Sequence, residues 1–220
     1  MALMILSFVG QLWALSLRGE QRGSCPLMDT GEYCLFLSWS LTLFYLLVGS
    51  TYRVSLLGMF TAPVVTVLLL VTGLPGVLDV NPVHANVLDY WGEVHAPLSV
   101  LSYGALALGA VAAVMFLVLN NFLKTGQMSS GLFQNMPPVH TLVGSMVRLT
   151  IVGLIFLTIG LVFGFFMSTD GGLHLWVAKV VWIAYLVLMA VWFIRGMTPQ
   201  RMAMLLLVMF IASLSVFAAL

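Results

Sequence analysis

The side chains in this sequence most able to do chemistry are four histidines, because neutral imidazole is the commonest metal ligand among side chains. They are His84, His95, His140 and His174. We expect His84 to be solvated in a polar loop and His140 to be a polar residue at a helix start. His95 and His174 each open an apolar stretch at the same predicted membrane surface. If those stretches are neighbours, the two imidazoles could ligate a haem iron axially; the alternative is a pair of interfacial histidines without a ligand.

Aromatic residues occur near both of these histidines. Trp91, Trp176 and Trp182 fall close to the same predicted membrane level. Tryptophan is enriched at the interfaces of membrane proteins in general, so an aromatic belt is one interpretation. The other is that Trp91 and Trp176 form the walls of a flat apolar cleft of porphyrin size.

Two cations lie inside apolar stretches, where an ionisable group costs about 2.5–3.5 kcal/mol at a helix centre. They are Arg148 and Lys179. Each side chain could extend along apolar surface and bring its charge to the head groups. Alternatively, Arg148 grips a carboxylate such as a haem propionate or a phosphate between helices, if the pocket is deep, and Lys179 contributes to a ligand site.

The composition fixes the class of protein that must position these residues. Only 7% of the 220 residues are charged, against about 25% in ordinary globular proteins, and 62% are hydrophobic. The mean hydropathy is +1.13. Such a surface requires a lipid bilayer as its solvent. The net charge of +1 gives no polyanion-binding field, so we expect no nucleic-acid partner.

The hydropathy pattern predicts an all-α, polytopic transmembrane helix bundle in a single transmembrane domain, residues 1–220. A spanning helix needs about 20 apolar residues, and 17 are tolerable. The sequence shows about seven such stretches, and no apolar–polar alternation typical of a barrel. The first lacks a basic residue before it and a cleavage pattern before Arg18, so we expect a retained span. The predicted spans are residues 2–17, 33–49, 54–74, 95–119, 141–167, 175–194 and 202–219.

The Lys and Arg residues of short connections predict the orientation. Arg18 and Arg22 fall on one side, together with an acidic, Lys- and Arg-free segment, residues 75–94. More cations fall on the side of the N-terminus: Arg53, Lys124, Arg195 and Arg201. We therefore expect a cytoplasmic N-terminus, in a bacterial inner membrane. The two cysteines, Cys25 and Cys34, could pair if their segment faces an oxidising compartment, or remain free thiols.

Small residues predict where helices touch. Gly160 and Gly164 form a GxxxG step, which allows close approach of two backbones. Ser102, Ala105 and Gly109 lie on one face of the span that begins at His95. These patterns favour bundling and say nothing about chemistry.

Three stretches resemble the Ccs-type cytochrome c assembly proteins, and most of all their HemX-like members. Residues 23–47 (GSCPLMDTGEYCLFLSWSLTLFYLL) are similar to the family's glycine-rich loop and Phe-Leu-Ser-Trp-Ser-Leu-Thr-Leu helix. Residues 95–112 (HAPLSVLSYGALALGAVA) are similar to a family helix that begins with histidine. Residues 148–164 (RLTIVGLIFLTIGLVFG) repeat the family's Arg, Leu-Thr-Ile-Gly and later Gly.

The resemblance implies a membrane protein that presents haem at the outer face for attachment to apocytochrome c, together with a second assembly subunit. His95 matches the first histidine flanking the family's tryptophan-rich haem segment. Trp176 and Lys179 fall where that segment, ending Trp-Asp-Pro-Lys-Glu, would lie, but Val177-Ala178 replaces Asp-Pro. Gln11 stands where relatives often have histidine. His174 as the second ligand is a conjecture from its position.

No Walker loop, zinc motif, Ser/His/Asp set or paired intramembrane carboxylates occur in the sequence, which argues against a hydrolase, a kinase or an ion pump. We therefore expect a haem-handling or assembly factor for cytochrome c maturation rather than a stand-alone enzyme. The alternative hypothesis is a degenerate relative that binds no haem and serves as a scaffold or regulatory subunit of a cytochrome assembly or haem-synthesis complex.

Overall fold

Helices dominate the computed structural model, which describes residues 2–52, 57–78, 90–125, 138–167 and 173–215, without the side chains of 49–52, 173 and 174. Every regular element in these ranges is helical, as the hydropathy pattern predicts. The helices are α1 (Ala2–Arg22), α2 (Thr30–Tyr52), α3 (Leu57–Thr72), α4 (Tyr90–Thr125), α6 (Val139–Phe165), α7 (Leu173–Ile194) and α8 (Pro199–Ser213).

Each predicted span corresponds to one helix. Five are long and apolar enough to cross a membrane, namely α1, α2, α4, α6 and α7, and α3 and α8 are shorter, at 16 and 15 residues. The chain is therefore an integral membrane protein with an all-α polytopic fold. That all seven helices cross the bilayer within one transmembrane domain stays a prediction.

The helix ends differ from the predicted spans. The segments 18–22, 90–94 and 120–125 are helical, although the sequence predicts connections there. Hydropathy marks the part of a helix that lies in lipid, whereas backbone hydrogen bonds continue into the polar interface. The 36 residues of α4 reach about 54 Å at 1.5 Å per residue, which exceeds a hydrocarbon layer of about 30 Å.

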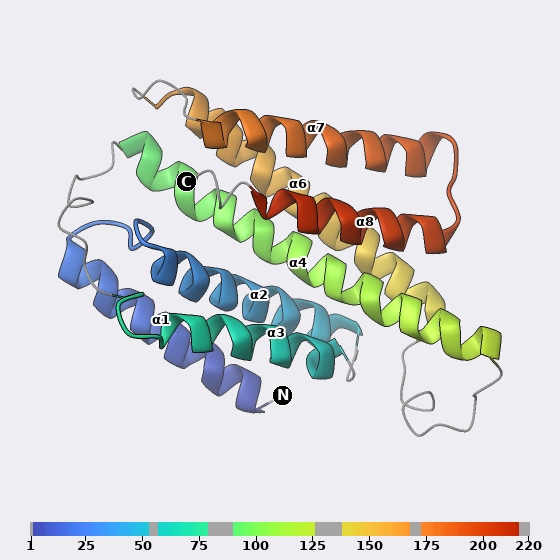
Figure 1. Ribbon diagram of the computed structural model, residues 1–220, viewed down its shortest axis with the longest axis horizontal. Coiled ribbons are helices and arrows are strands. Elements are labelled where there is room, and N and C mark those ends of the chain that lie inside the picture. Colours follow the sequence, from blue (N-terminus) through green and yellow to red (C-terminus); the bar gives the residue numbers. More distant parts are fainter. Residues whose placement is uncertain (1, 53–56, 79–89, 126–137, 168–172, 216–220) are drawn as a thin grey trace.

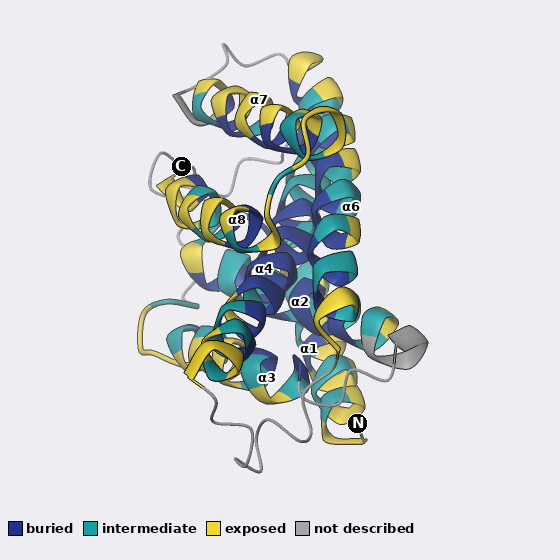
Figure 2. Ribbon diagram, turned by 90° about the vertical axis from the view of Figure 1, so that its right-hand side faces the viewer, coloured by how far each residue is buried: buried dark blue, intermediate teal, exposed yellow. Residues whose placement is uncertain are grey.

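Successive helices run in opposite directions, and α4 lies at the centre of the bundle (Figure 1). It packs most extensively on α6 and also contacts α2, α3 and α8. As a result, α4 is mostly buried, whereas α7 is exposed over much of its surface (Figure 2). A helix that is apolar on all sides is stable only when neighbours or lipid surround it.

The small residues of α4 allow this close packing, as their spacing predicts. Ser102, Ala105 and Gly109 are buried. A methyl group on Gly104 would overlap the Ser40 hydroxyl oxygen of α2, and one on Gly153 of α6 would lie 2.7 Å from Leu106. Larger residues at these glycines would force the helices apart.

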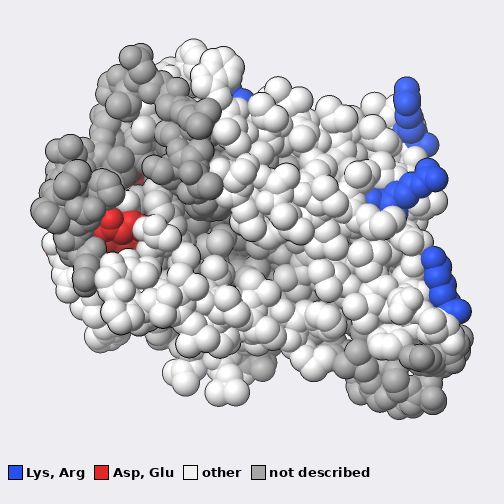
Figure 3. All heavy atoms as spheres, in the orientation of Figure 1, with Lys and Arg blue, Asp and Glu red and all other residues white. Residues whose placement is uncertain are grey.

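The charged residues divide between the two ends of the bundle. We call the end where α4 begins the His95 end and the end where it finishes the Lys124 end. Arg18 and Arg22 lie at the His95 end, because they close α1. Figure 3 shows basic side chains gathered over the Lys124 end, where Lys124, Arg195 and Arg201 lie, and acidic side chains toward the other end. This division follows the predicted one; Arg53 lies outside the described residues.

A buried ion cluster closes the His95 end between α1 and α2. Arg22 donates to the carboxylates of Asp29 and Glu32. Glu32 is fully buried, and its second oxygen accepts hydrogen bonds from the backbone N–H groups of Met28 (3.0 Å) and Asp29 (3.4 Å). The cluster therefore fixes the connection that carries Cys25.

Candidate functional site

His95 lies in the second turn of α4, where it faces the last third of α6. Its Nδ1 atom is 2.7 Å from the carbonyl oxygen of Gly160. A carbonyl oxygen can only accept, so Nδ1 carries the proton and donates it. The lone pair of this imidazole therefore resides on Nε2, and the hydroxyl of Ser99, at 3.5 Å, is its other neighbour.

The two glycines of the GxxxG step form the surface against which this histidine rests. A methyl group on Gly164 would lie 2.8 Å from Nδ1 and 2.9 Å from Cε1 of His95. A methyl group on Gly160 would lie 2.9 Å from the Ser99 hydroxyl oxygen. The step thus holds an imidazole in a defined orientation, in addition to its predicted role in helix contact.

An aromatic group lies one turn nearer the end of the bundle. Trp91 precedes His95 by four residues, so the two side chains share one face of α4. Its ring stacks on Phe163, with centroids 5.9 Å apart, and lies 5.3 Å from the ring of Phe166. The rings join the first turn of α4 to the end of α6.

The first turn of α7 adjoins the same place. The methyl position on Gly164 that touches His95 also lies 3.1 Å from Leu175, which is buried. Leu175 directly follows His174 in the chain. The His174 side chain lies outside the described residues, so its role as a second ligand stays a prediction. His84 lies outside the described ranges, and its expected solvation stays a prediction as well.

Trp176 and Lys179 lie on the exposed surface of α7. Trp176 is 64% exposed, and the ammonium of Lys179 lies 4.5 Å from the centre of its ring. This is a cation–π contact between two side chains of one helix face. Their predicted roles as wall and ligand residues stay predictions.

Arg148 lies far from the His95 group. It precedes Gly160 by twelve residues of α6, which is about 18 Å along the axis at 1.5 Å per residue. Its side chain is exposed. The structure therefore brings together His95, Trp91 and the start of α7, and leaves Arg148 at a different membrane level.

Cys25 lies at the same end of the bundle, in the connection between α1 and α2. Both cysteines are free thiols in the structure. Burial, together with the smaller effect of the nearby carboxylates of Glu93 and Glu32, raises the pKa of Cys25 to about 11. The thiol therefore stays protonated at neutral pH, which makes it a poor nucleophile.

The sequence did not predict Ser99 as a neighbour of His95, nor Phe163 and Phe166 as neighbours of Trp91. In the structure, His95 and Gly160 each lie five residues from the His95 end of their helices, which places them at the same level. Within the described ranges, no three His, Cys, Asp or Glu side chains gather to hold a bare metal ion. Haem iron needs fewer protein ligands, since the porphyrin supplies its own nitrogens.

Comparison with known proteins identifies the family. The model of the cytochrome c assembly protein family matches residues 28–219. The chain belongs to this family. The match includes α2 to α8 and every residue of the His95 group.

Three curated relatives of this assembly protein are called cytochrome c biogenesis protein CcsA. The one from Chlorella vulgaris is 32% identical over 111 residues, which are 49% of this chain and 35% of the relative. The one from Trichormus variabilis is 33% identical over 108 residues, which are 48% of this chain and 31% of the relative. The one from Ranunculus macranthus is 32% identical over 122 residues, which are 53% of this chain and 38% of the relative. The chain therefore matches about a third of the length of these relatives.

Proposed function

We propose that this protein binds haem at the His95 end of the bundle and presents it for cytochrome c maturation. The observation that carries the proposal is the hydrogen bond between His95 Nδ1 and the Gly160 carbonyl, 2.7 Å long. It fixes the tautomer and the orientation of the ring, as outer hydrogen bonds do for metal-bound histidines. Membership of the cytochrome c assembly family supports the same function.

His95, with its neighbours Gly160 and Ser99, suits the role of an axial ligand of haem iron. Because Nδ1 donates to Gly160, Nε2 offers a lone pair, and the Ser99 hydroxyl at 3.5 Å competes only weakly for it. The bound haem would supply the iron that His95 ligates and the porphyrin that apocytochrome c receives. His174 is the proposed second ligand, and the contact of the adjacent Leu175 at Gly164 supports it.

Aromatic side chains complete the proposed site. Trp91, held by Phe163 and Phe166, would cover one side of a flat ring system. Trp176 and Lys179, at the start of α7, would lie along its lipid-exposed edge. Arg148 would reach a propionate only in a pocket that runs about 18 Å along α6 from Gly160.

The same proposal covers the partners and the location. The His95 end faces the outer compartment and the Lys124 end faces the cytoplasm, because Lys124, Arg195 and Arg201 lie at the latter. The membrane is a bacterial inner membrane. Apocytochrome c receives the haem, and a second assembly subunit completes the machine, as the family resemblance implies.

A second candidate function is a scaffold or regulatory subunit that binds no haem. The position of Gln11 favours it, because this residue is buried in α1 where the family resemblance expects a histidine. Its amide nitrogen donates to the Ser7 hydroxyl at 3.2 Å. An amide is a poor iron ligand, so Gln11 would not replace a histidine that ligates iron at this position.

The test is the haem content of the purified protein. We would extract the wild type, His95→Ala and Ser99→Ala with detergent and record haemochrome spectra. Haem in the wild type and in Ser99→Ala, together with its loss in His95→Ala, is the expected result. Unchanged haem in His95→Ala would refute the ligand. A protein without haem that co-purifies with assembly subunits would select the scaffold function.

A further inference from the structure

A pocket of about 490 Å³ lies at the opposite, Lys124 end of the bundle, between α7 and α8. Its volume falls within the range of small-molecule sites, about 300–1,000 Å³. None of its lining residues belongs to the proposed haem site. The lining residues are Val191, Arg195, Gly196, Met197, Thr198, Arg201 and Leu205.

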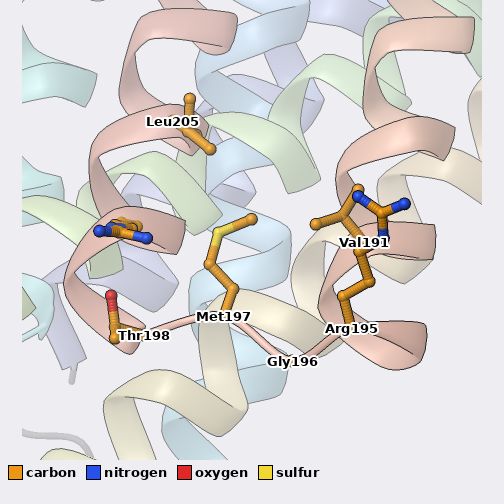
Figure 4. Close-up of a pocket in the computed structure, with 7 residues that line it drawn as sticks. Val191, Arg195, Gly196, Met197, Thr198 and Leu205 are labelled. Carbon is orange, nitrogen blue, oxygen red and sulfur yellow. The ribbon is translucent and has the colours of Figure 1, made fainter.

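The turn between the two helices creates this pocket. Gly196 has a φ of +69°, a left-handed conformation that ends α7 and that other residues adopt with strain. Pro199 then begins α8 directly after Thr198. Figure 4 shows the Met197 side chain rising between the helices, with Arg195 on one side and Thr198 on the other.

Two positive charges line this one pocket. Arg195 and Arg201 are both exposed. In the part of the chain that the structure describes, the ion pairs are formed by Arg22 at the other end of the bundle. No carboxylate in this part neutralises the guanidinium of Arg195 or Arg201. The planar guanidinium group matches the geometry of phosphate better than an ammonium does. Thr198 adds a hydroxyl that does not cap α8.

The rest of the lining is apolar and continues onto the lipid-exposed surface. Val191, Met197 and Leu205 line the pocket. The adjacent Ile194 and Val208 are 82% and 64% exposed, as expected for side chains that contact acyl chains. A molecule that fits both the basic and the apolar part of the pocket carries a phosphate group and a hydrocarbon chain.

We propose that this pocket binds the head group of an anionic phospholipid. The phosphodiester lies between Arg195 and Arg201, and the upper part of an acyl chain lies along Val191 and Leu205. The site is independent of the haem proposal, because it uses different residues at the other end of the bundle. Lipid bound there would hold the α7–α8 turn at a fixed depth in the interface.

Lipid binding to the full, detergent-purified chain tests this inference. Native mass spectrometry would measure the affinity of the first bound phosphatidylglycerol and, separately, phosphatidylcholine. The test variant is Arg195→Gln/Arg201→Gln. The matched control is Lys124→Gln, which removes a positive charge at the same end; Lys124 donates to Gln200 (3.0 Å) but does not line the pocket. Helix content by circular dichroism would verify that each variant folds.

The inference predicts that phosphatidylglycerol binds the wild type more tightly than phosphatidylcholine. The double variant would lose at least about tenfold of that affinity, since two charge-assisted contacts disappear, and Lys124→Gln would lose less than about threefold. An equal loss of affinity in Lys124→Gln would show that the lipid is attracted by the overall positive charge of this end of the bundle and not bound in the pocket, which would overturn the proposal. An unchanged double variant would also overturn it. Displacement of the lipid by millimolar inorganic phosphate would assign the pocket to free phosphate instead.

Discussion

His95 and Gly160 are joined by a hydrogen bond of 2.7 Å from the ring nitrogen Nδ1 to the backbone carbonyl oxygen. The donor and acceptor come from two helices, α4 and α6, that pack more extensively on each other than any other pair. A side chain held in this way cannot rotate freely. The bond therefore defines which nitrogen, Nε2, keeps a lone pair that can be donated to a metal ion.

The first prediction concerns the glycine surface behind His95. Gly164→Ala places a methyl group 2.8 Å from Nδ1, so the ring or the α6 backbone must move. We expect a loss of about 1–3 kcal/mol in the free energy of unfolding, as for an overpacked core. Thermal unfolding in detergent measures it.

Gly144→Ala is the matched control for this substitution. It lies in the same helix, and a methyl group there meets nothing within 4 Å. We expect no loss of stability in this variant. Equal melting temperatures for Gly164→Ala and Gly144→Ala would show that the contact with His95 is unimportant for the fold.

The second prediction concerns the ion cluster at the His95 end. Arg22→Met removes the guanidinium that pairs with the buried carboxylates of Asp29 and Glu32. Breaking a buried ion pair in this manner costs about 3–5 kcal/mol. Chemical unfolding of the purified protein would measure the loss. Glu20→Gln, an exposed carboxylate two residues away, should change stability by less than about 0.5 kcal/mol; similar values for the two variants would contradict the prediction.

The third prediction concerns the reactivity of Cys25. Burial and the carboxylates of Glu93 and Glu32 disfavour its thiolate, which raises the pKa to about 11. Alkylation of Cys25 in a Cys34→Ser background should therefore be slow at pH 8 and rise toward a midpoint near pH 11. An ordinary thiol has its midpoint at about 8.5.

Glu93→Gln tests the electrostatic part of this shift. Removing the negative charge should lower the midpoint for Cys25, because the thiolate then meets less repulsion. A midpoint of about 8.5 in the parent protein would show that Cys25 is solvated. An unchanged midpoint in Glu93→Gln would show that the charge of Glu93 does not contribute to the raised pKa.

Much of the fold could be predicted because hydropathy reports directly on the lipid environment. The predicted stretch 141–167 agrees with α6 to within two residues at each end. The ends of α4 could not be predicted, since Glu93 and Lys124 are polar residues that lie in helical conformation outside the apolar stretch. The ion cluster of Arg22 was also missed, because a polar connection gives no signal for which charges pair.

The candidate site was only partly predictable for a similar reason. His95 follows from its position at the start of an apolar stretch, and Gly160 with Gly164 from their spacing. The contact of His95 with these glycines depends on how α4 and α6 are aligned along each other, which the sequence of neither helix determines alone. The distance of Arg148 from His95 depends on the same register, and for this reason the sequence left its role open.

Imidazole rescue tests whether His95 ligates haem iron through Nε2. The measurement is the optical spectrum of haem added to detergent-purified wild type and His95→Gly, with and without free imidazole. We expect a histidine-ligated spectrum in the wild type, its loss in His95→Gly and its return with imidazole. The same haem spectrum in His95→Gly without imidazole would show that His95 is not the ligand.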